Sequence, residues 1–380
     1  MQIVASTRRA SRWRMISDHD IARWRLRSQH LVRPHAGSVV GVVAHLLAVQ
    51  AENPSQSAWA VASRTSDPSP GELRSALQDG RVIRTHVLRP TWHYVRAEDI
   101  GWLLELTAPR VRQTTSKQLQ AVHGLDARLL ERVTSEVVEI VGEQPGLTRG
   151  QIAESLRSRG VHTDGGLMTI LLAHLELDRL VCSGRPFDDE HTYVLFADRV
   201  PKARRLDRSE ALAELALRYF SGHGPATERD LAYWATLTLT DVRHGLNLVN
   251  GQLASFEHEG RTFWHAPADP PRRRGEPTAH LLQILDETYR GYQDTRWVLD
   301  AAAIVPRARE SSAGMALVDA QLLAATRRMV TSDRVVFELT PYRSLDAKEL
   351  AALQRAAKRY GRYLDLVPTL ELSQRGRGRS

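Results

Sequence analysis

One arrangement of elements occurs three times along this chain, and it restricts the fold more than any other feature. Each copy has a run of helical patterns that ends in two adjacent strand-like segments. Three short helices followed by a β-hairpin is the winged-helix arrangement, a helix-turn-helix with a wing. Because the spacing agrees in all three copies, the repeat is stronger evidence than any single copy. The sequence therefore predicts winged-helix units in tandem.

The first copy is expected to have helices at 38–50, 55–64 and 69–79, and strands at 82–88 and 91–96. Ser69 and Glu72 match a capping box, with Pro70 as the first helical residue. Arg89 and Pro90 separate the two strands. We expect this hairpin to be the wing of the unit.

The other copies have comparable start signals. Thr148 with Gln151 predicts a second capping box, Thr227 is expected to cap a short helix, and Thr240 the helix after it. The second copy is predicted at 126–142, from 148, at 164–178, 180–183 and 191–196. The third is predicted at 209–221, 227–234, 241–249, 252–258 and 261–265, with a turn at 259–260.

The chain after residue 266 does not repeat the pattern of helices followed by a hairpin. Residues 267–277 are rich in proline and arginine, which indicates a linker or an exposed loop. Strands are predicted at 315–318, 322–329 and 334–339, and a long basic helix at 346–366. The fold class is therefore α+β and mainly α, with a small β-rich C-terminal domain. The expected division is a basic tail (1–19), three units (20–115, 116–204, 205–268), the C-terminal domain (269–370) and a basic tail (371–380).

Charge and cysteine content restrict partners and location. The 380 residues carry 52 Lys and Arg against 44 Asp and Glu, a net charge of +8. This excess favours a polyanionic partner, although an arginine-rich composition also fits a GC-rich genome. The single cysteine, Cys182, indicates a reducing compartment and is expected in the core. An apolar run of about 18 residues is absent, and the N-terminus lacks the apolar region of a secretory signal, so we expect a cytoplasmic protein.

A polar segment interrupts the first two helical patterns. Gln50, Glu52 and Asn53 lie between apolar runs, just before Pro54. Proline disfavours helical geometry at Asn53 and can itself be the first residue of the next helix. If the chain is extended here, Gln50 and Glu52 point to the same side. The alternative is an ordinary polar helix end exposed to water.

Basic and polar side chains define the expected nucleic-acid surface. In the first unit the third helix offers Arg74, Ser75 and Gln78, and the wing offers Arg81, Arg84, Arg89 and Arg96. The third helix of the second unit is strongly apolar, so it is expected to be structural. The third unit offers Arg243, His244 and Asn247.

Other kinds of site find little support in the sequence. The chain has no HExxH, no paired cysteines and no phosphate-binding glycine loop, so neither a metal nor a cofactor is expected. His86 and His93 fall in the two strands of the first wing. A hydrogen-bonded structural histidine is the more common case, and His93, like Asn53, is also a candidate for supporting a site at Gln50 and Glu52.

Several ordered segments give the chain a recognisable pattern. They are RLRSQHL (25–31), VQAE (49–52), RTHVLRPTWH (84–93), LDETYRGY (285–292) and VVFELTPY (335–342). Over about residues 20–370 the chain resembles the AlkZ/YcaQ-type winged-helix DNA glycosylases. The resemblance implies a C-shaped body on duplex DNA, a barrel-like C-terminal region, and hydrolysis of the N-glycosidic bond of N7-alkylated purines, including bulky adducts and crosslinks.

The resemblance also implies a catalytic motif at Gln50-Ala51-Glu52. Relatives have Gln, an apolar residue, then Gln or Asp, and Glu52 departs from that pattern. Glutamate has the reach of Gln and the charge of Asp, so it can replace either. The expected partner is damaged double-stranded DNA, bound by a monomer without a cofactor. Two other interpretations stay open: a non-catalytic DNA-binding protein, such as a regulator or damage-binding factor, and a protein–protein scaffold.

Overall fold

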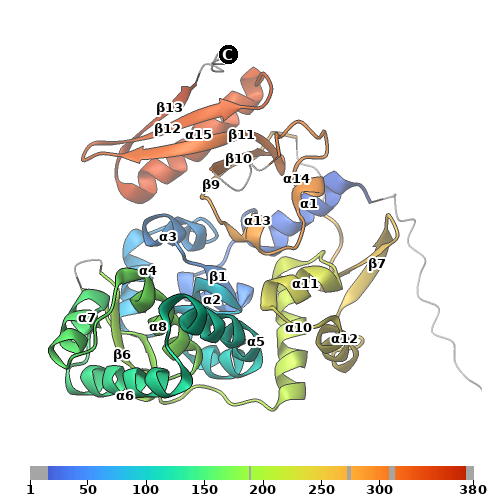
Figure 1. Ribbon diagram of the computed structural model, residues 1–380. Coiled ribbons are helices and arrows are strands. Elements are labelled where there is room, and N and C mark those ends of the chain that lie inside the picture. Colours follow the sequence, from blue (N-terminus) through green and yellow to red (C-terminus); the bar gives the residue numbers. More distant parts are fainter. Residues whose placement is uncertain (1–15, 188–189, 272–274, 308–312, 374–380) are drawn as a thin grey trace, which may run out of the picture.

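The computed structural model describes residues 16–187, 190–271, 275–307 and 313–373 (Figure 1). Helix α1, Asp18–Ser28, opens on a capping box between Ser17 and Asp20, so helical structure begins within the expected basic tail. The remainder of the two expected tails, residues 1–15 and 374–380, lies outside the described residues. The mixed fold, mainly helical, is confirmed. Among the described helices, none is both long and apolar enough to cross a membrane.

The first helix–hairpin group occupies residues 39–96. Its elements are α2 (Val39–Leu46), β1 (Ala48–Gln50), α3 (Pro54–Ala62), α4 (Pro70–Gln78), β2 (Val82–Val87) and β3 (Arg89–Arg96). Strands β1, β3 and β2 form one sheet in that order, with both pairs antiparallel. Pro54 is the first residue of α3, as predicted.

The helix predicted to reach Gln50 ends earlier. It stops at Leu46, Leu47 has a φ of 67°, and the next three residues form β1. An unbroken apolar run does not distinguish a buried helix from a buried strand, and pairing with β3 decides here for a strand. The extended alternative at Gln50 is therefore the observed one.

Two further local predictions for this group were wrong. Ser69 makes no capping hydrogen bond, because Glu72 instead accepts from the backbone N–H of Val39 (2.9 Å) at the start of α2. The hairpin turns at Leu88, whose φ is 67°, and Arg89 already belongs to β3. At Glu72 a contact with α2 replaces the predicted capping box, and at Arg89 pairing with β2 replaces the predicted turn.

Helix α5, Ala97–His123, follows the first group and contains Pro109. It runs through residue 115, where the first two units were expected to meet. The helix packs against α8 and β3, and it ends at Gly124, whose φ is 67°. One long helix thus joins the two groups.

The second group confirms its predicted cap at Thr148, and Asp126 also caps the first helix of the group. Asp126 accepts from the N–H of Leu129, and Thr148 with Gln151 forms the expected capping box. Its strands form a sheet in the order β4-β6-β5. The elements are α6 (Ala127–Glu143), β4 (Leu147–Thr148), α7 (Arg149–Ser158), α8 (Gly165–Leu177), β5 (Val181–Ser183), β6 (Thr192–Leu195) and α9 (Phe196–Arg199).

The third group has the predicted order with one shifted cap. Thr227 caps α11 as expected, but α12 is capped by Thr238 and not by Thr240. The hairpin turns at Glu259 and Gly260, which both have positive φ. The elements are α10 (Arg208–His223), α11 (Glu228–Ala235), α12 (Leu239–Leu248), β7 (Ala254–His258) and β8 (Arg261–His265).

The C-terminal sheet has five strands in the order β13-β12-β11-β10-β9 (Figure 1). The predicted strands and the long helix are present, with Asp346 capping that helix; β9, β13, α13 and α14 were not predicted. Helix α15 packs on the sheet. The elements are β9 (Ala279–Leu282), α13 (Glu287–Arg290), α14 (Arg296–Leu299), β10 (Gly314–Val318), β11 (Gln321–Val330), β12 (Arg334–Pro341), α15 (Ala347–Leu364) and β13 (Val367–Leu372).

Helix α3 connects the first group to the C-terminal sheet, which lies above it in Figure 1. Trp59 of α3 packs against Tyr360 and Tyr363 of α15, and its indole N–H donates to the carbonyl of Leu281 (3.0 Å). The first and third groups share another core, in which Ala48 and Ile83 meet side chains of α10 and α12. The segment 48–54 therefore lies where all these parts meet.

Candidate active site

Gln50 and Glu52 contact each other at the end of β1. The side-chain Oε1 of Gln50 accepts from the backbone N–H of Glu52 (2.7 Å). Gln50 is 3% exposed, whereas Glu52 is exposed. One oxygen of the Glu52 carboxylate accepts from the backbone N–H of Trp92 (3.2 Å). The buried side-chain amide of Gln50 therefore fixes the backbone of Glu52, whose carboxylate lies at the surface.

Asn53, the third member of the polar segment, has a local role. It is the residue before α3 and makes no side-chain cap for that helix. Its Oδ1 accepts from the hydroxyl of Ser55 (2.8 Å). The amide of Asn53 thus braces the turn that follows Glu52.

His93 lies opposite Gln50 in the sheet and is fully buried. Burial, and then the neighbouring Arg89 charge, lower its pKa to about 3, so the ring is neutral at physiological pH. Its Nδ1 lies 2.9 Å from the carbonyl oxygen of Thr91, and its Nε2 has no partner among the described residues. His93 therefore lies on the interior side of Gln50, and its support of the site stays a prediction.

Glu287, in the first turn of α13, was not singled out from the sequence as a site residue. Its Oε1 accepts from the backbone N–H of Gln50 (2.8 Å). Its Oε2 accepts from the indole N–H of Trp234 (3.1 Å) and lies 3.3 Å from Nε2 of His223. Glu287 is fully buried; burial opposes its charge, but the His223 hydrogen bond and nearby cations lower its pKa to about 2. Only its place in the segment 285–292 could have drawn attention to it.

Most arginines of the predicted wing contact other groups of the protein. Arg84 donates to the carbonyl of Ala51 (3.0 Å) and stacks on Trp92, with 4.2 Å from Cζ to the ring centroid. Arg89 donates to the carbonyl of Arg290 (2.8 Å), and Arg96 pairs with Asp99 (2.9 Å). These contacts fix the hairpin beside the motif. Arg81 is exposed and pairs with Asp79 at 3.2 Å.

The other predicted DNA contacts lie at the surface. Arg74 and Gln78 are exposed on α4, and Arg243, His244 and Asn247 are exposed on α12. Arg243 pairs with Glu228 (2.8 Å), and His244 lies 3.3 Å from the hydroxyl of Ser209. Helix α8 of the second group is largely buried, as its apolar sequence predicted.

The second group packs against strand β2 of the first hairpin. Glu176 of α8 accepts from the backbone N–H of His86 (3.1 Å) and from its ring, and it is fully buried. The ring of Trp92 packs between His86 and His191. His86 is therefore a structural histidine, in the role that its position in the strand favoured.

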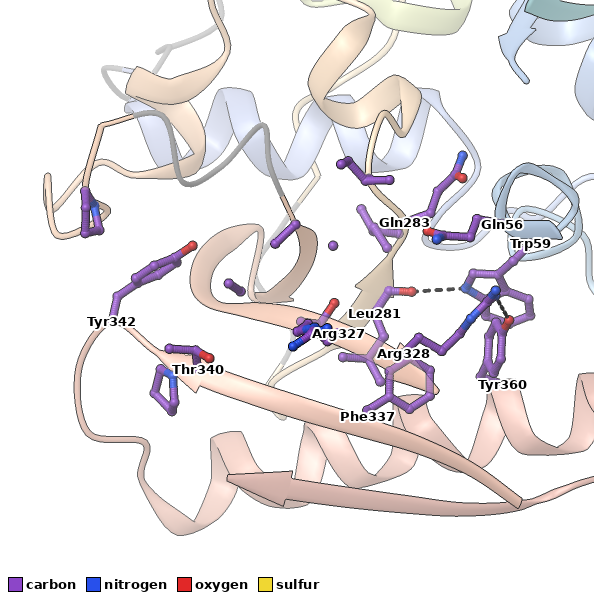
Figure 2. A pocket seen from close by; sticks show the side chains of 18 of the residues that line it. Gln56, Trp59, Leu281, Gln283, Arg327, Arg328, Phe337, Thr340, Tyr342 and Tyr360 are labelled. Atoms are coloured by element: carbon purple, nitrogen blue, oxygen red, sulfur yellow. Dashed lines mark hydrogen bonds between the residues drawn. The ribbon is translucent and has the colours of Figure 1, made fainter. Parts of the chain in front are cut away.

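A pocket of about 730 Å³ lies between α3 and the C-terminal sheet (Figure 2). Gln56 and Trp59 of α3 line one side, and Arg327, Phe337 and Tyr342 line the other. Arg328, also in the lining, donates to the carbonyl of Ser55, three residues from Glu52 (3.4 Å). The pocket thus borders the helix that begins just after the motif.

Two further groups bear on metals and thiol chemistry. Among the described residues, one group of side chains lies close enough together to hold a metal ion: Asp18, His258 and Glu259. Within this group, Nε2 of His258 lies 2.7 Å from Oδ1 of Asp18. Cys182 is buried in the core as predicted, and burial raises the pKa of its thiol to about 12.

Comparison with known proteins shows which protein family the chain belongs to. The family described as DNA glycosylase AlkZ-like matches residues 43–363, which is most of the chain. The chain therefore belongs to the AlkZ-like DNA glycosylase family.

A known protein and a solved structure that this chain resembles both come from Streptomyces sahachiroi. An interstrand DNA cross-link repair glycosylase of Streptomyces sahachiroi is 26% identical over 251 residues, which are 63% of this chain and 66% of that protein. The solved structure of Streptomyces sahachiroi DNA glycosylase AlkZ has a TM-score of 0.73 at 20% identity, covering 95% of this chain and all of that one. The second likeness establishes the fold.

Proposed function

We propose that this protein is a monofunctional DNA-repair glycosylase that hydrolyses the N-glycosidic bond of N7-alkylated purines in duplex DNA. The exposed Glu52 carboxylate, anchored beside buried Gln50, is the observation that carries the proposal. Membership of the AlkZ-like family supports the reaction class. We further propose that the three helix–hairpin groups act as tandem winged helices and that one monomer binds one damaged site.

The chemistry suits these two side chains. Alkylation at N7 puts a positive charge on the purine, so the base leaves with the electron pair of the glycosidic bond and needs no protonation. The sugar then carries oxocarbenium-like charge, which a nearby carboxylate stabilises. We assign Glu52 the roles of electrostatic partner and of base that takes the proton of the attacking water. Gln50 keeps Glu52 in place, and no step requires a metal.

Bulky adducts and crosslinks are part of the proposal. A named relative acts in interstrand cross-link repair. The pocket beside α3 has the volume of a ligand site and combines arginine, amide and aromatic groups, so it has room for the substituent of a large lesion. The exposed polar residues of α4 and α12 supply the proposed contacts with the duplex: Arg74, Gln78, Arg243, His244 and Asn247.

The test is formation of an abasic site in duplexes that contain one N7-methylguanine or one bulky N7 adduct. The proposal predicts base release from at least one of these duplexes. Binding without release from any of them would contradict it and favour the non-catalytic alternative. A footprint at a defined sequence of undamaged DNA would favour a regulator, and salt-independent DNA binding would favour a scaffold.

A further inference from the structure

We propose that Glu287 is a positioning residue of the glycosylase site: its carboxylate fixes the backbone at Gln50, and Gln50 then fixes Glu52. This inference rests on the proposed function. Glu287 is fully buried while Glu52 is exposed, so Glu287 acts through Gln50 and does not touch the substrate.

The backbone N–H of Gln50 faces away from the strand that pairs with β1. Strand β1 is an edge strand, paired only with β3. The N–H of Ala51 donates to the carbonyl of Trp92 (2.7 Å), so the N–H of Gln50 points away from the sheet. An outward N–H on an edge strand needs a partner when it is buried. Glu287, 237 residues along the chain, supplies it.

A continuous series of hydrogen bonds connects Glu287 to the Glu52 carboxylate. Glu287 accepts from the N–H of Gln50 (2.8 Å), Oε1 of Gln50 accepts from the N–H of Glu52 (2.7 Å), and the Glu52 carboxylate accepts from Trp92 (3.2 Å). Each bond fixes the donor or acceptor of the next. A displacement at Glu287 therefore reaches the proposed base.

A carboxylate at position 287 satisfies its hydrogen-bond partners where a carboxamide would not. A buried charge is costly unless it is fully hydrogen-bonded. Here a single carboxylate receives the N–H of Gln50, the indole N–H of Trp234 and the ring of His223. A carboxamide of the same shape has only one acceptor oxygen, so it cannot serve both Gln50 and Trp234. The third group, through α10 and α11, thus holds Glu287 in its ionised form.

The experiment compares Glu287→Gln with the wild-type protein in single-turnover base release at saturating duplex. We expect a rate about tenfold lower or more and a DNA dissociation constant within about threefold of wild type. Asp300→Asn is the matched control, because Asp300 is a nearly buried carboxylate that accepts from the N–H groups of Ile304 and Val305 away from the motif. Equal rate losses in the two variants, at equal loss of thermal stability, would overturn the positioning role.

A second variant separates positioning from simple destabilisation. Trp234→Phe removes the competing indole donor. The unpartnered Nδ1 of His223 can take the ring proton, so that Nε2 accepts from the carboxamide that Glu287→Gln introduces. Trp234→Phe should then slow the wild-type enzyme but accelerate the Glu287→Gln variant. Additive losses in the double variant would contradict the proposal.

Hydrogen exchange supplies a readout that needs no activity. Glu287→Gln should accelerate exchange of the Gln50 amide, whereas Asp300→Asn should leave it unchanged. If the wild-type protein releases no base, the proposed reaction fails, but this comparison still tests whether Glu287 fixes Gln50. Unchanged exchange at Gln50 in Glu287→Gln would overturn the inference.

Discussion

At the scale of single residues, the motif combines a buried amide with an exposed carboxylate. Gln50 is held by Glu287 on one side and holds Glu52 on the other. The carboxylate of Glu52 accepts from the backbone N–H of Trp92, which belongs to the neighbouring strand β3. This contact holds a carboxylate at the position proposed for the base.

Gln50→Ala should lower the single-turnover rate of base release about tenfold or more, because it removes the acceptor for the Glu52 N–H. The free energy of unfolding should fall by about 1 kcal/mol, the usual cost of one hydrogen bond. Both quantities can be measured on the same preparation, with Gln118→Ala, an exposed amide on α5, as the control. An unchanged rate for Gln50→Ala would remove Gln50 from the site.

At the scale of elements, the parts of the fold that were predicted are those with local signals. The hairpins and the caps at Thr148 and Thr227 depend on neighbouring residues in the sequence. Strand β1 and the contact from Glu287 depend on partners far along the chain, so neither the apolar run nor the Asp286-Glu287 pair could indicate them. For the site, the sequence indicated Gln50 and Glu52 but not what holds them.

Helix α3 is tied to α13 by a buried ion pair that offers an element-scale test. Arg64, just after α3, donates to both oxygens of Asp286 (2.8 and 3.1 Å), and both side chains are fully buried. Arg64→Ala should cost about 3–5 kcal/mol of unfolding free energy, because it leaves a buried charge unpaired. Arg343→Ala, which removes the exposed partner of Glu349, should cost less than about 1 kcal/mol. Similar losses in urea unfolding would contradict the assignment.

Helix α12 is predicted to contact the phosphate backbone. Arg243→Ala should weaken binding to all duplex sequences alike and lower the slope of log affinity against log salt by about one. The slope is measured by fluorescence anisotropy over a range of salt concentrations. Arg112, an exposed arginine of α5 paired with Asp178, is the matched control. A salt slope unchanged by Arg243→Ala would place α12 outside the DNA surface.

At the scale of the whole molecule, buried and half-buried neutral histidines should make the fold sensitive to acid. Burial lowers the pKa of His93 to about 3 and that of His45 and His280 to about 4. Below about pH 6.5 the unfolded chain binds protons at these rings and the folded chain does not, so stability falls as pH falls. Each ring contributes a slope of up to about 1.4 kcal/mol per pH unit.

Urea unfolding between about pH 7 and pH 5 measures this dependence. His280→Gln should make the slope shallower by up to one proton. The low pKa of Glu287, about 2, acts in the same direction at lower pH, because its contribution is complete above about pH 4.5 and is lost towards pH 2. A flat stability profile from pH 7 to pH 5 would show that the rings are protonated in the folded state.

The central claim is that Glu52 performs the chemistry on a cationic purine. The most direct measurement is single-turnover release of the base from a duplex with one N7-methylguanine, by the wild-type protein and Glu52→Gln in parallel. We predict that the wild-type protein leaves an abasic site, while the variant binds the duplex with similar affinity and is slower by about a hundredfold or more. Equal rates for the two proteins would contradict the account.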